Sequence, residues 1–362
     1  MRKLTPTWRV GVPQLYAGLL LLAFLFLCLW RAEGRPLDGN ERAAVETGHW
    51  LWHGQPIPRD AVESPLTDLL AAAVAAASPG ALPPRLPTVF FGLALGASVW
   101  YVARRLYGNA GGYVALALYC FAPQVIARSA RVDTRVLAAW GVFGVIFTAI
   151  GAAHTLQAPR ANRLLRVWLL GLAIGLGMGA QFFVALAVPA ALAFMLYLVP
   201  GRRVAAALLV ALACGIAGSI LLAVYSFDFT ALAQGLRHSP WLGFGAAQGA
   251  PRLGNLAAAL YARDLAALLL LAAALATYLL WPRCRYFGNT APLLVAAGLA
   301  ALALLAPEPA KFLFPALPFA FVFIGGIAAD LLETPQRKLA LAAVVALLVA
   351  HAALSLQFLL SS

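Results

Sequence analysis

Residues 31–65 read RAEGRPLDGNERAAVETGHWLWHGQPIPRDAVESP and form the longest polar stretch of a very apolar chain. Six of the thirteen acidic residues lie in it: Glu33, Asp38, Glu41, Glu46, Asp60 and Glu63. An apolar run long enough to cross a membrane comes directly before this stretch, and several more follow it. Because charges inside a membrane are costly, the stretch predicts a polar loop between membrane helices and the place where a functional site begins.

The composition is that of a polytopic membrane protein. Hydrophobic residues make up 63% of the chain, charged residues only 11%, and the mean hydropathy is +0.87. The apolar runs have the length of helices, so an all-α bundle is expected rather than a barrel. The net charge of +13 is scattered between these runs, which argues against a nucleic-acid partner, and the four cysteines are expected to be buried or membrane thiols.

The positions of the basic residues predict the topology. Arg2, Lys3 and Arg9 precede the first span, Val12 to Trp30, which is read as a retained anchor, so the N-terminus is expected in the cytoplasm. About 11 transmembrane helices then keep the later Arg pairs on the same side and leave the C-terminus extracytoplasmic. The expected architecture is a single domain over residues 1–362, with interfacial helices in the extracytoplasmic loop 31–79 and no soluble C-terminal domain.

Two local features refine this picture. Asn40 is expected to cap a helix that ends near Gly54, and Leu66 to Ala77 is too short to span and is expected to lie at the outer surface. Val167 to Gly201 is a run of 35 residues between cytoplasmic arginines, so it must cross twice as two shortened helices. The break between them is expected at Gly175 to Gln181, near the outer side.

Carboxylates and arginines recur together in three outer elements, residues 37–50, 63–66 and 128–135. A transferase that moves a sugar from a lipid phosphate to a hydroxyl needs a carboxylate to accept the hydroxyl proton and cations to hold the departing phosphate. Both residue types are present at one membrane face, and we expect the site there.

The order of motifs resembles that of the GT-C membrane glycosyltransferases. An acidic start to the first loop is followed by the turn ESPL, by RLP opening a span that ends ARRLYG, by RSARVDT before another span, and by KFLFPALP late in the chain. The likeness covers most of Leu37 to Gly326. It is closest to the bacterial branch that includes protein mannosyltransferases, aminoarabinose transferases and their Rgt-like relatives.

The resemblance implies a bacterial inner-membrane enzyme that transfers a sugar from a polyprenyl-phosphate donor to an acceptor hydroxyl on the extracytoplasmic face. The acceptor would be a lipid, a glycan or a protein. Asp38 or Glu41 would be the base, both in a solvated outer loop, and Asp133 would match the family's second acid. The candidate substrate-binding residues are Arg59, Glu63, Arg128, Arg131 and Lys311.

Simpler roles compete with these assignments. Asp38 and Glu41 are also good helix-capping acids, Asp133 a good surface ion-pair partner, and Lys311 a good interfacial anchor. His49 and His53, four residues apart, are weak candidates for a divalent metal together with Glu46 or Glu63, and no other cofactor is expected.

A different class of function also fits. Ser64 and Gln181 stand where relatives of this family carry lysine, so two expected cations are missing. This favours, as the alternative, a catalytically inactive accessory or structural subunit of a membrane complex with other membrane subunits. A lipid carrier or flippase is disfavoured because the spans hold almost no charge.

Overall fold

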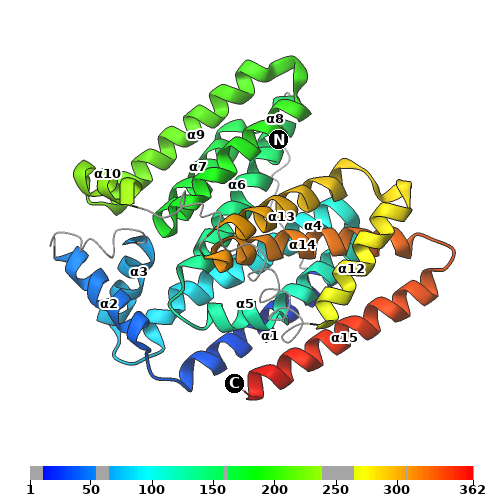
Figure 1. Cartoon of the computed structure of the whole chain (residues 1–362), viewed down its shortest axis with the longest axis horizontal. Coiled ribbons are helices and arrows are strands. Elements are labelled where there is room, and N and C mark those ends of the chain that lie inside the picture. The colour runs from blue at the N-terminus through cyan, green and yellow to red at the C-terminus, as the bar shows by residue number, and fades with distance from the viewer. Residues whose placement is uncertain (1–10, 54–64, 158–161, 239–264, 307, 362) are drawn as a thin grey trace, which may run out of the picture.

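The structure is a computed structural model that describes residues 11–53, 65–157, 162–238, 265–306 and 308–361 (Figure 1). All the regular structure of these residues is helical, which confirms the expected all-α class. The α-helices are α1 (Val12–Glu33), α2 (Gly39–Trp52), α3 (Pro65–Ala77), α4 (Leu86–Cys120), α5 (Pro123–Ser129), α6 (Thr134–Gln157), α7 (Arg163–Ala180), α8 (Ala187–Leu198), α9 (Arg203–Val224), α10 (Phe229–His238), α12 (Leu265–Leu280), α13 (Phe287–Leu305), α14 (Pro309–Leu332) and α15 (Arg337–Ser361). Short 3₁₀ turns include η2 (Pro83–Arg85) and η3 (Phe182–Leu186).

The bundle has a buried centre and a rim of exposed apolar helices. In α14 and α6, 83% and 72% of the apolar window is buried, whereas the figure is 17% in α15 and 22% in α1 and α9. In Figure 1, α9 and α15 lie at opposite edges of the molecule, with α13, α14 and α4 between them. Exposed apolar helices at the edge are the surface that a bilayer covers.

Eight helices in the described part of the chain are long and apolar enough to cross a membrane, so the expected count of about 11 is not confirmed. The difference has physical reasons. Two expected crossings fall within the single segment Pro83–Cys120, and two others fall on the shorter apolar helices Phe182–Leu198 and Leu265–Leu280. The multi-pass membrane character itself is confirmed.

Helix α4 doubles back at Gly108. This residue has φ 75° and ψ −170°, a conformation that favours glycine. A Cβ added to Gly112 would lie 3.0 Å from the Cβ of Arg104, although the two residues would be far apart along a straight helix. The turn therefore supplies one of the reversals that the charge pattern predicts.

The break expected between Gly175 and Gln181 is confirmed at Gln181. Helix α7 ends at Ala180, Gln181 is extended with φ −155° and ψ 128°, and the chain continues through η3 into α8. Helices α6 and α7 pack closely here, since a Cβ on Gly141 would come within 2.6 Å of the Cα of Gly177.

Hydrogen bonds between residues at or near helix ends group these helix ends into two sets, one at each end of the bundle. At one end Arg31 Nη1 donates to Leu359 O at 3.3 Å, and Gln181 Nε2 donates to Thr134 Oγ1 at 2.7 Å. At the other end Tyr107 Oη donates to Gly288 O at 2.5 Å. This grouping is the one that the basic residues predict, while the side of the membrane that each end faces stays a prediction.

Helices α2 and α3 form a close pair at the first of these ends, at one edge of Figure 1. A Cβ on Gly48 would lie only 2.1 Å from Asp68 O, so the backbones approach directly. The expected helices of the first loop are thus present, but the cap is Asp38 and not Asn40. Asp38 has extended backbone geometry and a side chain that can bond three residues ahead, which is what an N-cap requires.

Candidate active site

The start of α2 is a capping box. Asp38 Oδ1 accepts a hydrogen bond from the Glu41 amide at 2.9 Å, and Glu41 Oε2 accepts one from the Asp38 amide at 3.0 Å. This reciprocal pair satisfies two amides that would otherwise lack partners at the helix start. It also places two carboxylates next to each other in space with different surroundings.

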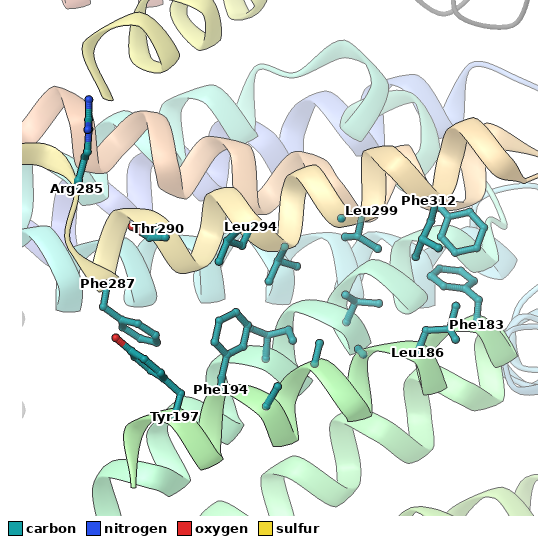
Figure 2. Close-up of a pocket in the computed structure, with 18 residues that line it drawn as sticks. Phe183, Leu186, Phe194, Tyr197, Arg285, Phe287, Thr290, Leu294, Leu299 and Phe312 are labelled. Atoms are coloured by element: carbon teal, nitrogen blue, oxygen red, sulfur yellow. The ribbon is translucent and has the colours of Figure 1, made fainter. Parts of the chain in front are cut away.

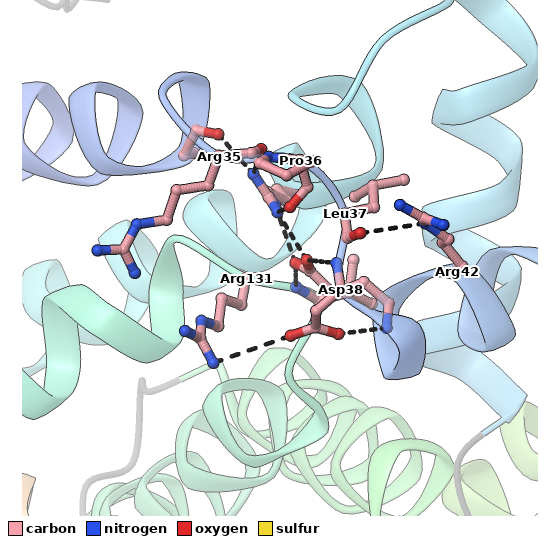
Figure 3. A network of polar contacts seen from close by, with 10 residues as sticks. Arg35, Pro36, Leu37, Asp38, Arg42 and Arg131 are labelled. Carbon is pink, nitrogen blue, oxygen red and sulfur yellow. Dashed lines mark hydrogen bonds and ion pairs between the residues drawn. The ribbon is translucent and has the colours of Figure 1, made fainter. Parts of the chain in front are cut away.

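Glu41 is locked into a buried ion pair with Arg85 (Figure 3). The guanidinium bonds it twice, Nε to Oε1 at 2.8 Å and Nη2 to Oε2 at 2.6 Å, and the two side chains are only 2% and 3% exposed. The other three N–H groups of Arg85 donate to the carbonyls of Ala32, Arg35 and Pro36. All five donors of the guanidinium are therefore used.

The carboxylate of Glu41 is used just as fully. Oε1 also accepts from the Val132 amide at 3.0 Å, so each oxygen accepts two hydrogen bonds. The expectation that Glu41 lies in a solvated loop is wrong. The reason is that η2, held by Pro83 and Pro84, brings Arg85 beneath the loop, and a cation there draws the carboxylate inward.

The pKa of Glu41 lies below its ordinary value of 4.5. Burial is the largest single influence and raises this pKa, but the hydrogen bond from Arg85, the amides of Asp38 and Val132 and the charge of Arg85 together outweigh it. Glu41 is thus charged at neutral pH and held by its partners.

Asp38 stays accessible. Its Oδ2 lies 3.9 Å from Arg131 Nη1, and the two side chains are 46% and 50% exposed. Both line a small pocket of about 230 Å³. Asp38 is therefore the member of the capping box with an oxygen that can meet a substrate.

Asp133 lies in the same region, directly before the first residue of α6. It accepts a hydrogen bond from Arg128 Nη1 at 2.8 Å and one from the Arg135 amide at 2.9 Å. Arg128 in turn lies over the ring of Phe314, 5.4 Å from its centroid, one turn beyond Lys311 on α14. Lys311 Nζ lies 3.6 Å from Glu308 Oε2. The structure thus brings Arg128, Asp133 and the start of α14 together.

An apolar groove of about 810 Å³ runs between α8 and α13, and Phe312, the neighbour of Lys311 on α14, lines it (Figure 2). One end is closed by Phe183 and Phe312, whose rings are 5.0 Å apart, and the other end reaches Tyr197 and Arg285. Phe183 follows Gln181, which bonds Thr134 next to Asp133. This end of the groove therefore lies toward the chain around Asp133.

The metal candidates do not converge in the described part of the chain. The rings of His49 and His53 are 6.5 Å apart, and His53 Nδ1 lies 2.7 Å from His49 O. No cluster of three metal-ligating side chains occurs among the described residues. Arg59 and Glu63 lie outside the described residues.

Two buried residues of this region were not singled out by the sequence. Arg85 precedes Leu86 and Pro87 in the motif RLP, and the only sequence signal of its role was a cation placed directly after two prolines. Asp68 on α3 is also buried, which raises its pKa to about 7.

Comparison with known proteins agrees with the motif order. Residues 63–227 match the family model described as dolichyl-phosphate-mannose-protein mannosyltransferase. No curated protein matches the chain in sequence. The resemblance to GT-C glycosyltransferases is thereby confirmed in part of the sequence, and the solved structures confirm it in the fold.

Two structures of ArnT from Cupriavidus metallidurans are similar. The apo state has a TM-score of 0.65 at 16% identity, covering 91% of this chain and 62% of ArnT. The structure bound to undecaprenyl phosphate has a TM-score of 0.61 at 16% identity, covering 86% and 60%. The apo oligosaccharyltransferase of Archaeoglobus fulgidus has a TM-score of 0.61 at 13% identity, covering 94% of this chain and 55% of that one. The chain thus spans about three fifths of the ArnT length, and at these identities the likeness is one of fold.

Replacing Arg85 by Met tests the buried pair. Arg85→Met leaves the Glu41 carboxylate without its cation, so we expect a loss of about 3–5 kcal/mol in unfolding free energy at neutral pH. Because the pKa of Glu41 in the folded state lies below the ordinary value of 4.5, the ion pair stabilises the fold at pH values above 4.5. This contribution to the unfolding free energy is lost as the pH falls through the lowered pKa of the folded state. The difference in unfolding free energy between the wild type and Arg85→Met should therefore become smaller in acid.

Thermal and denaturant unfolding in detergent, from pH 7 to pH 4, measures this. Arg42→Met is the matched control, because Arg42 is exposed and donates only to Leu37 O in the described structure. If Arg85→Met lost no more unfolding free energy than Arg42→Met, the Glu41–Arg85 pair would not be what holds the loop before α2.

Proposed function

We propose that this chain, which has the GT-C fold and matches the mannosyltransferase family over residues 63–227, is a membrane glycosyltransferase. It transfers a sugar from a polyprenyl-phosphate donor to an acceptor hydroxyl at the end of the bundle that carries Asp38 and Asp133. This end faces the extracytoplasmic side of the bacterial inner membrane, with the N-terminus in the cytoplasm, as the basic residues predict.

The observation that carries the proposal is the difference in burial and hydrogen bonding between the two acids of the capping box. Glu41 accepts four hydrogen bonds and is buried, whereas Asp38 keeps an accessible oxygen. A general base must reach the proton that it removes, so Asp38 is the base and Glu41 positions it. This supports Asp38 over Glu41 in the choice that the sequence leaves open.

The reaction follows from these positions. The acceptor hydroxyl oxygen forms a bond to the anomeric carbon while its proton passes to Asp38 Oδ2. The bond from that carbon to the phosphate oxygen breaks, and its electron pair leaves on the phosphate. A phosphate is already a competent leaving group, so cations rather than an acid assist its departure.

Arg128 and Lys311 are the cations that we assign to the donor phosphate. Arg128 is held by Asp133 at 2.8 Å and by the ring of Phe314, so its guanidinium is oriented before a substrate arrives. Lys311 stands at the start of the same helix, beside Phe312 at the end of the apolar groove. A phosphate at this point would let an isoprenoid chain run down the groove between α8 and α13.

The likeness of fold to ArnT, of which one structure holds undecaprenyl phosphate, supports a donor of this class. The groove is long and lined mainly by apolar side chains, which suits an isoprenoid chain. The absence of a lysine at position 181, which holds Gln181, keeps an inactive accessory subunit as the second candidate, because one expected cation is missing there.

Asp38→Asn should remove transfer. Asparagine is also a good N-cap, so the stability of α2 should change little, while loss of a general base costs about 10²–10⁴ in rate. The assay is transfer from a polyprenyl-phosphate sugar in proteoliposomes, and the control is Glu46→Gln, an exposed acid of the same helix. Full turnover in Asp38→Asn would exclude Asp38 as the base.

Filling the groove should block the donor. A Cβ on Gly298 would meet open space, and this residue lines the groove, so Gly298→Leu places a side chain where the isoprenoid would lie. We expect undecaprenyl phosphate binding, measured by native mass spectrometry, to weaken about tenfold or more without loss of thermal stability.

Gly218→Leu is the control for this substitution. Its added Cβ also meets open space, but it lies on α9 and does not line the groove, so binding should stay at the wild-type level. Unchanged binding in Gly298→Leu would move the lipid chain to the second apolar groove, about 510 Å³ between α12, α13 and α14 with Arg128 at its rim.

A further inference from the structure

The groove between α8 and α13 is bounded at both ends by aromatic rings (Figure 2). At the end where α14 begins, the rings of Phe183 and Phe312 are 5.0 Å apart. At the far end the ring of Phe287 contacts two rings of α8, lying 6.0 Å from Phe194 in an edge contact and 5.8 Å from Tyr197 in a stacked pair. We call Phe194, Tyr197 and Phe287 the aromatic cluster. The apolar part of the groove therefore has a limited length.

The helix residues that line the groove give this length. On α13 the lining runs from Thr290 to Leu302, which is about 18 Å at about 1.5 Å per residue. On α8 it runs from Ala187 to Tyr197, which is about 15 Å by the same measure. An isoprene unit has four carbon–carbon bonds of about 1.5 Å along its chain, so an extended unit covers about 5 Å. The groove therefore has room for about three to four isoprene units.

The groove is open along one side. Its inner side is lined by Val142 and Ile146 of α6, which are buried. At its walls Leu294 and Tyr197 are 57% and 72% exposed. A chain longer than the groove can therefore leave sideways into the bilayer, where lipid tails surround it as well as apolar side chains would. The part that leaves makes no further contact with the groove.

We propose that the protein recognises only the first isoprene units next to the donor phosphate, about three to four of them, and that Ala193 determines how many are held. Ala193 lines the groove directly before Phe194 of the aromatic cluster, and its small side chain keeps the far half of the groove open. The inference rests on the proposed donor class and narrows it. Polyprenyl phosphates that fill the groove should bind alike, however long the rest of the chain is.

The test measures how geranyl, farnesyl, geranylgeranyl and undecaprenyl phosphate bind to the full chain in phosphatidylcholine nanodiscs. These probes carry two, three, four and eleven isoprene units. Bound probe is counted by native mass spectrometry, and the affinity is expressed as a mole fraction of the lipid. For the wild type we expect the affinity to rise about tenfold from geranyl to geranylgeranyl phosphate, because each unit in the groove adds van der Waals contacts. From geranylgeranyl to undecaprenyl phosphate it should change by less than about twofold.

Ala193→Phe places a large side chain in the far half of the groove. The affinity for geranylgeranyl phosphate should fall about tenfold, to that for geranyl phosphate, which should itself stay at the wild-type value. Ala301→Phe is the control, because Ala301 is an exposed residue of α13 that lines neither apolar groove. It should keep the wild-type dependence on chain length.

Three outcomes would overturn the inference. An affinity that keeps rising from geranylgeranyl to undecaprenyl phosphate, or one that is equal for all four probes, would do so while the donor class stands. A wild-type dependence on chain length in Ala193→Phe would show that the chain lies elsewhere. If no probe bound at all, the proposed donor class would fail together with the inference. A melting temperature within the wild-type range confirms that each variant is folded, and Ala193→Leu carries the comparison if the phenylalanine variant is not.

Discussion

The buried pair of Glu41 and Arg85 is the interaction on which the polar end of this molecule depends. A charge removed from water is costly, and both groups are almost fully buried. The pair persists because every donor of the guanidinium and both lone pairs of each carboxylate oxygen have partners. These partners belong to the end of α1, the loop before α2, the start of α2, and the chain entering α6. One ion pair thus joins three parts of the chain that are far apart in sequence: residues 32–41, Arg85 and Val132.

This arrangement divides the work between two neighbouring acids. The charge of Glu41 is balanced by Arg85, and all its hydrogen-bonding positions are used, so its role is structural. Asp38 can therefore remain at the surface of the same helix turn, with an oxygen exposed beside Arg131. Because Glu41 also holds the Val132 amide, it sets the position of Asp133 on the next residue, and hence of Arg128 against α14. The proposed base and the proposed phosphate cations are therefore positioned by one buried contact that touches neither substrate.

Much of this fold is visible in the sequence. Apolar runs predict the helices, and the arginines around Val167 to Gly201 require two short helices with a break, which the structure has at Gln181. The expected count of about 11 spans is not confirmed, because the length of a helical segment alone does not count its crossings, as in α4, which reverses at Gly108. The motifs named Asp38, Glu41 and Asp133 but left the choice of base between Asp38 and Glu41 open. That choice depends on Arg85, 44 residues from Glu41, and no periodicity reports a contact of that kind.

The most direct test of this account is hydrogen exchange at the amides of Asp38 and Val132, which Glu41 accepts from opposite sides. If the buried pair joins the segments, the two amides share one opening event and should exchange with similar protection in the wild type. In Arg85→Met, studied below its melting temperature, both should exchange faster by a similar factor. Faster exchange at Asp38 with Val132 unchanged would contradict the account, because it would mean that α2 frays alone and that the chain entering α6 is held by something else.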